Sequence, residues 1–496
     1  MRRSIRAVLL AAIAMPFMIS CSGEGNGDLY RAEKDLYSAR KLNGELVLAT
    51  MNREFLDRTI DAYRKVVSGY SSMTGSIDGM EMIVVSAQME LAELEFRAGM
   101  LEAAREDFLT ASAMAVSIEE ARANAVWSAA YISMEMGDLE RSLSLFEKFV
   151  DDFLTPEKAE RTFRMNGRYL VTPIRIAELN TRLGDEKRAK EWFDRAVSIY
   201  QGLIASSGDS LVVRETRYDL LTARLQGGDW NGAAETVAEM KRIYANRIDT
   251  PSLLFIEAKV EAEGLGRTAR AVPALRKIID EYPDSHQKLP AMLMLASLHM
   301  KEGRLEEAVA LYGEILEKHG NATREAAEAS WQMAAIAESQ GNWVDASLHY
   351  KSTYTNYPST VQGMESPIRI ASHFREIGES AAAAGAYARA RELYERLMSE
   401  QYGEGIRIMA EEYYIRSLSE EKKWAEAAER LLGLPDRYPD YHKFRQNYLL
   451  AASIYEKEMG DTAKAVSVLE RCVSDHPDSP LAGEAQRQLD RIRGKN

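Results

Sequence analysis

Cysteine is nearly absent from this chain, which has two in 496 residues. No Cys-x-x-Cys pair occurs, and the seven histidines show no His-x-x-x-His or His-Glu-x-x-His spacing, so no metal site is indicated. Phosphate-binding Gly-rich loops and the Gly-x-Ser-x-Gly turn of hydrolases are missing too. The sequence therefore predicts a protein that is not an enzyme and that holds no cofactor and no metal.

Positive charge is also in short supply. Lysine and arginine number 63 against 76 aspartates and glutamates, and the net charge is −13. This deficit argues against binding to nucleic acid and against a broad basic surface facing anionic lipid. Apart from one N-terminal stretch, long apolar runs are missing, which excludes a polytopic membrane protein. The length exceeds one ordinary compact domain, so we expect either several domains or an elongated array.

The single apolar run, Ala7 to Ile19, follows three arginines and is succeeded by Ser20 and Cys21. A basic start, a short apolar stretch and a small residue are typical of a secretory signal peptide, and the run is too short to span a bilayer. Met-Ile-Ser-Cys at 18–21 resembles the bacterial lipobox, with Met18 where leucine is usual. The resemblance implies that residues 1–20 are removed and that Cys21 is lipidated. An ordinary secreted protein with an incidental Cys21 is the alternative.

Lipidation at Cys21 has consequences for the residues that follow. The resemblance implies a diacylglyceryl thioether and an N-acyl chain, together sufficient for stable anchoring. Residues 21–29 are polar and rich in glycine, which favours a flexible tether. Ser22 is not the aspartate that retains some lipoproteins on the inner membrane, so we expect the periplasmic face of the outer membrane. The remaining cysteine, Cys472, then has no partner for an intramolecular disulfide.

From residue 85 onward one pattern recurs, most clearly in residues 293–320. Each copy has a turn marker between two apolar-periodic segments, and the markers are spaced by 37 to 47 residues. Residues 55–67 look like the second helix of a further unit. The ten markers are Gly99, Gly137, Gly184, Gly228, Gly266, Gly303, Gly341, Gly385, Lys422 and Gly460.

Each unit reads as two helices. Five residues after the marker comes a small residue and four further on a large one, as in Ala308 and Tyr312. Small and large residues at i and i+4 share a helical face, so the first lets two helices approach and the second fills the space beyond. Glycine at the marker would end the first helix in the left-handed conformation. Ser366 followed by Pro367 predicts a helix start.

The marker, the small residue, the large residue and a closing proline resemble the tetratricopeptide repeat (TPR) over roughly residues 30–495. The resemblance implies an all-α fold, a right-handed superhelical solenoid of about ten to eleven helix pairs. We divide the chain into an atypical N-terminal unit at 30–84, the repeat array at 85–478 and a C-terminal capping helix at 479–496. Several repeat junctions look like those of bacterial envelope TPR lipoproteins that assemble the outer membrane.

In the family, first helices line a concave surface that binds partners. The register places Trp127, Tyr131, Tyr218 and Trp331 on that surface, where aromatic side chains are effective binding anchors. The alternative is that they pack against neighbouring helices. The lysines and asparagines with which chaperone-binding TPR proteins clamp a terminal carboxylate are absent at the matching positions, which disfavours acidic C-terminal tails as ligands.

These observations predict a membrane-anchored, non-catalytic scaffold that mediates protein–protein interaction in the bacterial cell envelope. Its expected partner is a protein or peptide, and neither nucleic acid nor metal is expected. The alternative function is that of a glycan-binding lipoprotein of the SusD kind, which also uses TPR helices. That family carries long irregular insertions, whereas here the longest departures from the period are about nine residues, near 155–170.

Overall fold

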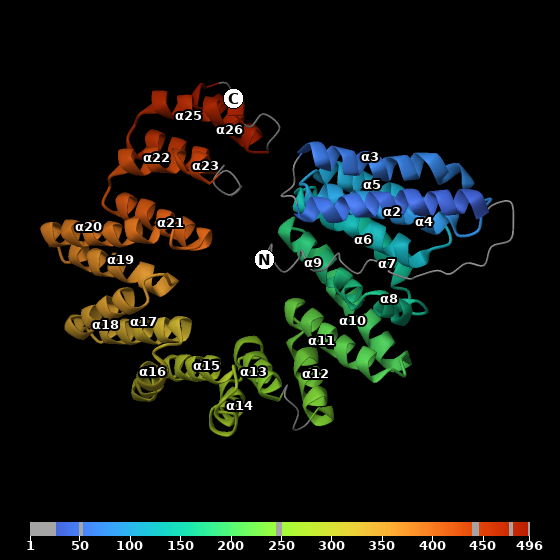
Figure 1. Ribbon diagram of the computed structural model, residues 1–496. Coiled ribbons are helices and arrows are strands. Elements are labelled where there is room, and N and C mark those ends of the chain that lie inside the picture. The colour runs from blue at the N-terminus through green and yellow to red at the C-terminus, as the bar shows by residue number, and fades with distance from the viewer. Residues whose placement is uncertain (1–25, 49–52, 245–249, 439–445, 476–479, 495–496) are drawn as a thin grey trace. The chain divides into compact units, whose positions relative to one another are not determined.

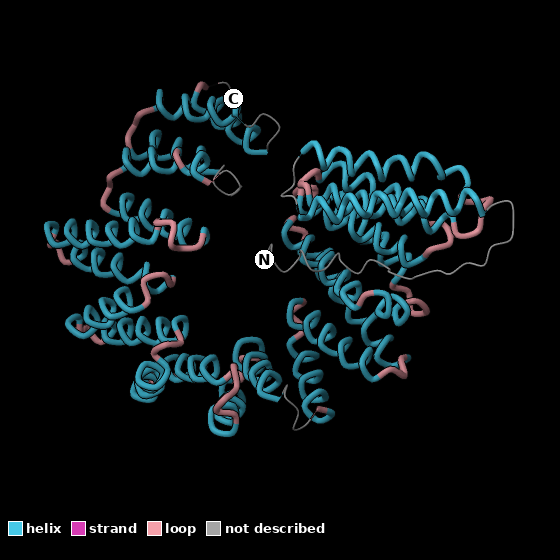
Figure 2. The backbone as a smooth tube through the Cα atoms, viewed as in Figure 1, coloured by secondary structure: helices cyan, strands magenta, loops and turns pink. Residues whose placement is uncertain are grey.

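The computed structural model describes residues 26–48, 53–244, 250–438, 446–475 and 480–494. All regular structure in these ranges is helical, and none of it is a strand (Figure 2). No helix in them combines the length and the apolar character needed to cross a membrane. The predicted signal peptide, residues 1–20, and Cys21 lie outside the described residues. The fold is that of an all-α TPR solenoid, as the sequence predicts.

The chain divides into two compact units, residues 1–266 and 267–496 (Figure 1). Unit 1 contains α2 Asn26–Leu48, α3 Arg53–Tyr70, η1 Ser71–Met73, α4 Met80–Arg97, α5 Leu101–Met114, α6 Glu119–Glu135, α7 Leu139–Phe153, α8 Ala159–Met165, η2 Gly167–Val171, α9 Thr172–Arg182, α10 Glu186–Ser206, α11 Ser210–Gln226, α12 Trp230–Ile243, α13 Thr250–Lys259 and η3 Val260–Gly264. Unit 2 contains α14 Thr268–Glu281, α15 Lys288–Lys301, α16 Leu305–His319, α17 Thr323–Ser339, α18 Trp343–Asn356, α19 Val361–Glu376, α20 Ser380–Leu397, α21 Glu404–Glu420, α22 Trp424–Leu432, α23 Leu434–Arg437, α24 Asn447–Ser453, η5 Ile454–Glu458, α25 Thr462–Asp475 and α26 Pro480–Ile492.

Within each unit, successive helices pack in antiparallel pairs (Figure 1). The first helix of a pair also contacts the first helix of the next one, as α15 does with α17, α17 with α19, and α19 with α21. First helices of neighbouring repeats therefore form one continuous face. The predicted C-terminal helix is α26, which packs on α25. The division between the units falls inside the repeat predicted around Gly266.

The turn between the two helices of a repeat has one repeated geometry. Gly303 has a φ of 75°, and the amide of Arg304 donates to the carbonyl of His299 at 2.9 Å, closing the end of α15. Lys422 adopts the same left-handed conformation with a φ of 60°, alone among the described non-glycine residues. The predicted role of Lys422 as a turn marker is therefore confirmed.

One predicted marker, Gly385, is wrong. Gly385 lies inside α20, and the left-handed turn is at Gly378, with a φ of 81°. The buried small and large residues of this repeat are thus Ala383 and Tyr387. The error is a slip of seven residues, almost two helical turns, so the residues seven positions further on lie on the same face and are buried as well.

The predicted helix start at Ser366 and Pro367 is also wrong. Both residues lie within α19, which begins five residues earlier at Val361. The true N-cap is Thr360, whose hydroxyl accepts a hydrogen bond from the amide of Gly363 at 3.0 Å. Ser366 instead donates to the carbonyl of Gln362 at 2.6 Å. The Ser-Pro pair therefore lies in the helix interior, where the Ser366 hydroxyl bonds back to the preceding turn instead of capping a helix start.

The expected flexible tether is shorter than predicted. Residues 26–29 form the first turn of α2, where Asp28 pairs with Arg31 and Leu29 is buried against the neighbouring helices. Apolar burial at Leu29 therefore outweighs the tendency of Gly27 to remain non-helical. The stretch near 155–170 folds into α8 and η2, and the hydroxyl of Thr162 donates to the carbonyl of Phe153 at 2.5 Å.

The core follows the small-and-large pattern. Ala308 is fully buried and Tyr312 nearly so, between α15 and α17. Cys472, three residues after the buried Leu469, is likewise buried in the core of the last repeat, and burial raises the pKa of its thiol. Apolar packing between neighbours thus supplies the stability of the repeats.

Lys422 provides a test of the turn. Lys422→Gly should raise the stability of unit 2 by about 0.5–1 kcal/mol, because glycine relieves the left-handed strain of a side chain. Gly303→Ala is the matched control and should lower stability by a similar amount, since no atom lies within 4 Å of the added Cβ and only the backbone conformation is penalised. Melting temperature would report both effects, and hydrogen exchange would localise them, across α21 and α22 for Lys422→Gly and across α15 and α16 for Gly303→Ala. Lower stability in Lys422→Gly would contradict the turn assignment.

Candidate functional site

Two of the predicted aromatic residues form a stack on α6. Trp127 and Tyr131 lie one helical turn apart, with ring centroids at 5.7 Å and an interplanar angle of 7°. Residues at i and i+4 share a helix face, which explains why the pair meets. Both side chains are half-buried. Burial raises the pKa of Tyr131 to about 12, and the neighbouring carboxylate of Glu135 acts in the same direction.

Arg175, on the next first helix, α9, completes this cluster. The carbon of its guanidinium lies 5.6 Å from the ring centroid of Trp127, 5.9 Å from that of Tyr131 and 6.0 Å from that of Phe146. Such placement over aromatic faces is a cation–π arrangement. Its Nη1 is 3.9 Å from the sulfur of Met134, and its buried Nε has no hydrogen-bond partner in the described structure. Among the described residues, no carboxylate lies within ion-pair distance of Arg175.

Trp127 also packs into the core of unit 1. Its ring meets Phe146 of α7 edge-on at 6.0 Å and Tyr169 of η2 at 5.8 Å. Its indole Nε1 donates to the hydroxyl of Thr172 at 3.2 Å. The sequence left open whether Trp127 lies on the groove surface or packs against neighbouring helices. The structure shows that it stacks on Tyr131 along the first helix and also contacts α7, η2 and α9.

The other two predicted groove residues lie elsewhere. Tyr218 packs in the cluster of α11, α12 and α13 in unit 1. Trp331 belongs to unit 2, where its ring meets Tyr350 at 6.3 Å and its buried Nε1 has no hydrogen-bond partner in the described structure. The structure therefore brings Trp127 and Tyr131 together, and Tyr218 and Trp331 belong to other clusters.

The sequence reasoning did not find a set of ion pairs that joins the first helices of unit 2. These pairs are Arg369 with Glu338 at 2.8 Å, Arg416 with Glu365 at 2.6 Å and Arg375 with Glu420 at 3.4 Å. Each joins α19 to an adjacent first helix, α17 or α21. Of these residues, Arg416 stands at a repeat position that the sequence analysis placed on the groove, six residues before its marker Lys422, as Tyr131 is before Gly137. These arginines differ from Arg175 because each has a carboxylate partner within the chain.

Glu420 is the most highly coordinated acid of this set. Besides its arginines, it accepts hydrogen bonds from the hydroxyls of Ser372 at 2.9 Å and Tyr387 at 3.1 Å. Burial disfavours the charged carboxylate, but hydrogen bonds from Ser372, Arg416 and Tyr387 outweigh it and lower the pKa of Glu420. This carboxylate is therefore committed to holding helices together.

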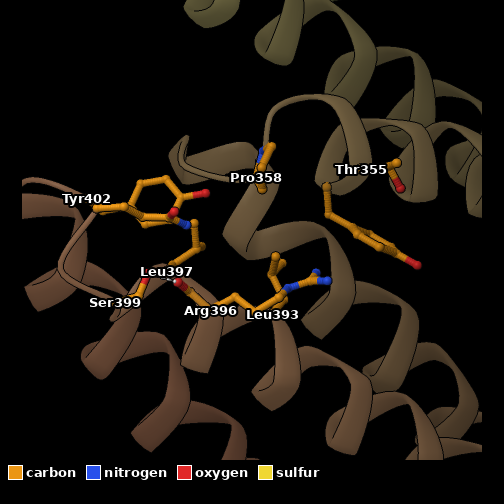
Figure 3. Close-up of a pocket in the computed structure, with 9 residues that line it drawn as sticks. Thr355, Pro358, Leu393, Arg396, Leu397, Ser399 and Tyr402 are labelled. Carbon is orange, nitrogen blue, oxygen red and sulfur yellow. Dashed lines mark hydrogen bonds between the residues drawn. The ribbon is translucent and has the colours of Figure 1, made fainter.

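An open pocket of about 530 Å³ lies in unit 2, between the ends of α18 and α20 and the loops that follow them (Figure 3). Its wall combines apolar and polar side chains, among them Tyr354, Pro358, Leu393, Arg396 and Tyr402. The repeat pattern gives no sign of this pocket, because loop residues from two repeats create it.

Models of the tetratricopeptide repeat match three segments of the chain, residues 174–202, 263–330 and 446–479. Together with the helix pairs and their turns, these matches support a tetratricopeptide repeat protein. They also support a role as a protein-interaction scaffold. None of the curated proteins matches the chain.

Solved structures with a similar fold include Naa15/Naa10 bound to HypK-THB, at 13% identity and a TM-score of 0.36, over 92% of this chain and 65% of that one. The present chain thus spans about two thirds of that protein's length. A tetratricopeptide repeat protein from Parabacteroides merdae matches at 11% identity and a TM-score of 0.32, over 58% of this chain and 94% of its own. RapI in its apo form matches at 16% identity and a TM-score of 0.32, over 55% of this chain and 97% of its own.

The double role of Trp127 can be tested by stability. Trp127→Ala should destabilise unit 1 by about 3 kcal/mol, because it leaves a cavity among aromatic rings and removes the bond to Thr172. Trp127→Phe is the matched control and should cost about 1 kcal/mol, since it keeps a ring but loses the indole donor. Thermal unfolding of both variants would measure the difference. An unchanged melting temperature in Trp127→Ala would mean that the ring contributes little to packing.

Proposed function

We propose that this protein is a lipid-anchored scaffold that holds a protein partner in the bacterial cell envelope, with the partner seated on the face shared by α6 and α9. The observation that carries the proposal is Arg175. Its guanidinium is partly desolvated among three aromatic rings and has no carboxylate partner among the described residues. By contrast, the ion-paired arginines on the first helices of unit 2 are already satisfied within the chain.

This arrangement favours a particular partner chemistry. A guanidinium presents several donors in a plane and binds a carboxylate through two parallel hydrogen bonds, most strongly where water is partly excluded. Trp127 and Tyr131 beside it offer apolar surface for a neighbouring side chain. The expected ligand is therefore a segment with an internal aspartate or glutamate next to an apolar or aromatic residue. One guanidinium is sufficient to bind the carboxylate of an aspartate or glutamate side chain. Recognition of a terminal carboxylate requires the clamp of lysines and asparagines, which is absent at the matching positions of this chain.

The anchor is proposed from the N-terminal sequence. The basic start, the apolar run of 7–19 and Cys21 after Ser20 favour export and lipidation. An N-acyl diacylglyceryl group would hold the chain stably at a membrane. The proposed location is the periplasmic face of the outer membrane, where the scaffold would act in assembling envelope complexes.

The anchor is tested at Cys21. Cys21→Ala should abolish incorporation of radiolabelled fatty acid and leave a soluble or unprocessed chain, because the sulfur to which the lipid is attached is gone. Fractionation of the cells would show where the chain is found, and labelling with radioactive fatty acid would show whether it carries lipid. Cys472→Ala is the control, since it removes the buried cysteine and should leave labelling unchanged. Equal labelling of Cys21→Ala and the unmodified chain would rule out the anchor.

The partner site is tested at Arg175. Partners would be crosslinked in intact envelopes, recovered with the scaffold and identified by mass spectrometry. Arg175→Gln should reduce recovery of the specific partner about tenfold or more, because a hydrogen-bonded charge contributes about 1.5–3 kcal/mol. Arg182→Gln, at the exposed end of the same helix, is the control and should recover the partner normally. Equal recovery with the two variants, both folded by their melting curves, would exclude this face as the binding site.

A further inference from the structure

Helix α2 carries a row of side chains that points away from the protein. Tyr30, Lys34, Tyr37 and Lys41 follow one another at spacings of four, three and four residues, which keeps them in a narrow strip along the helix. The tyrosines are 67% and 70% exposed, high values for such large side chains. The opposite side of α2 is buried by Leu29, Ala32, Leu36, Ala39 and Leu46.

The remaining charged groups of α2 are mostly engaged within unit 1. Arg40 pairs with Glu90 of α4 at 2.6 Å, Arg31 pairs with Asp28, and Asp35 accepts a hydrogen bond from Tyr70 at 3.0 Å. In the described residues, Lys34 and Lys41 make no ion pair. The helix has four basic and four acidic residues, in a chain whose net charge is −13. Glu33 and Glu45 of the same helix are exposed as well. The row itself thus combines two aromatic and two basic side chains, on a helix that lacks the negative excess of the whole protein.

The row lies close in the chain to the proposed anchor. Four residues separate Cys21 from the start of α2 at Asn26, and the five backbone steps between the two residues span at most about 18 Å when extended. The four helical steps from Asn26 to Tyr30 add about 6 Å. A lipid on Cys21 would therefore hold the beginning of the row within about 24 Å of the membrane surface.

We propose that the row Tyr30, Lys34, Tyr37 and Lys41 rests on the phospholipid headgroup layer, with α2 lying along the membrane. The proposal rests on the lipid anchor proposed above. Tyrosine is enriched at membrane interfaces because its ring is apolar and its hydroxyl is polar. Lysine extends an aliphatic stem along apolar material and places its ammonium among phosphates. A strip of alternating tyrosine and lysine therefore matches the chemistry of this layer, and the short connection to Cys21 favours lipid over a protein as its occupant.

Contact along α2 would give the scaffold a defined orientation. An anchor at one point leaves a protein free to tilt, whereas a second contact of about 16 Å from Tyr30 to Lys41 restrains it. The other end of unit 1 would then project away from the membrane surface. The row binds lipid weakly by itself, so it acts only after lipidation has brought it to the surface.

The experiment places a fluorescent reporter beside the row. Ser38→Cys, exposed next to Tyr37, would be labelled with nitrobenzoxadiazole in the lipidated full chain, because Cys21 is blocked by lipid and Cys472 is buried. Val344→Cys, 69% exposed on α18 in unit 2, is the control position. Both proteins would be reconstituted in vesicles of phosphatidylethanolamine and phosphatidylglycerol. These vesicles would also contain a lipid whose nitroxide group lies close to the headgroups.

We expect the emission of the label at position 38 to shift to the blue and to be quenched by the nitroxide-labelled lipid. The label at position 344 should show neither effect. Replacing Tyr30 and Tyr37 by serine should restore most of the emission at position 38, while the protein still floats with the vesicles. Floating protein with an unquenched label at 38 would overturn this inference and leave the anchor intact. A blue shift that grows with protein concentration and is not accompanied by quenching from the nitroxide lipid would also overturn it, in favour of a second copy. Failure to float would overturn the anchor and this inference together.

Discussion

Close approach of paired helices is the constraint on which the rest of the structure depends. A repeat can bury its core only if a small residue, such as Ala308, lets the second helix approach the first. That approach requires a sharp turn, which is made by a residue in the left-handed conformation and a bond back to the helix end. Lys422 shows that this geometry is maintained even where the side chain opposes it.

Once helices pair in this way, the first helices of neighbouring repeats come into contact, from α15 to α21 in unit 2 and from α2 to α6 in unit 1. The side chains between them determine what such a face can do. In unit 2, Arg369, Arg375 and Arg416 bind carboxylates of neighbouring first helices, so their charges serve the fold. In unit 1, Arg175 lies over aromatic rings instead. This difference between two similar faces is the basis for placing a partner on unit 1.

The candidate site could be predicted only in part. The spacing of Trp127 and Tyr131 is local, so the helix period suffices to place the two rings together. Arg175 is 44 residues from Tyr131 along the chain and belongs to another repeat, and its approach depends on how α9 packs beside α6. The slip at Gly385 has a related cause, because two helical turns return the chain to the same face and the repeat pattern fits both registers.

By itself, the sequence determined the helix pairs, the residues that let them approach and most of the turns. These features depend on contacts within a few residues or between adjacent helices. The spacing of small, large and turn-forming residues along the chain is enough to predict such contacts. Only the tertiary structure decided which charged and aromatic side chains meet across repeats. It also decided that Tyr30 and Tyr37 remain outside the core, because the burial of Leu29 and Leu36 directs the opposite side of α2 outward.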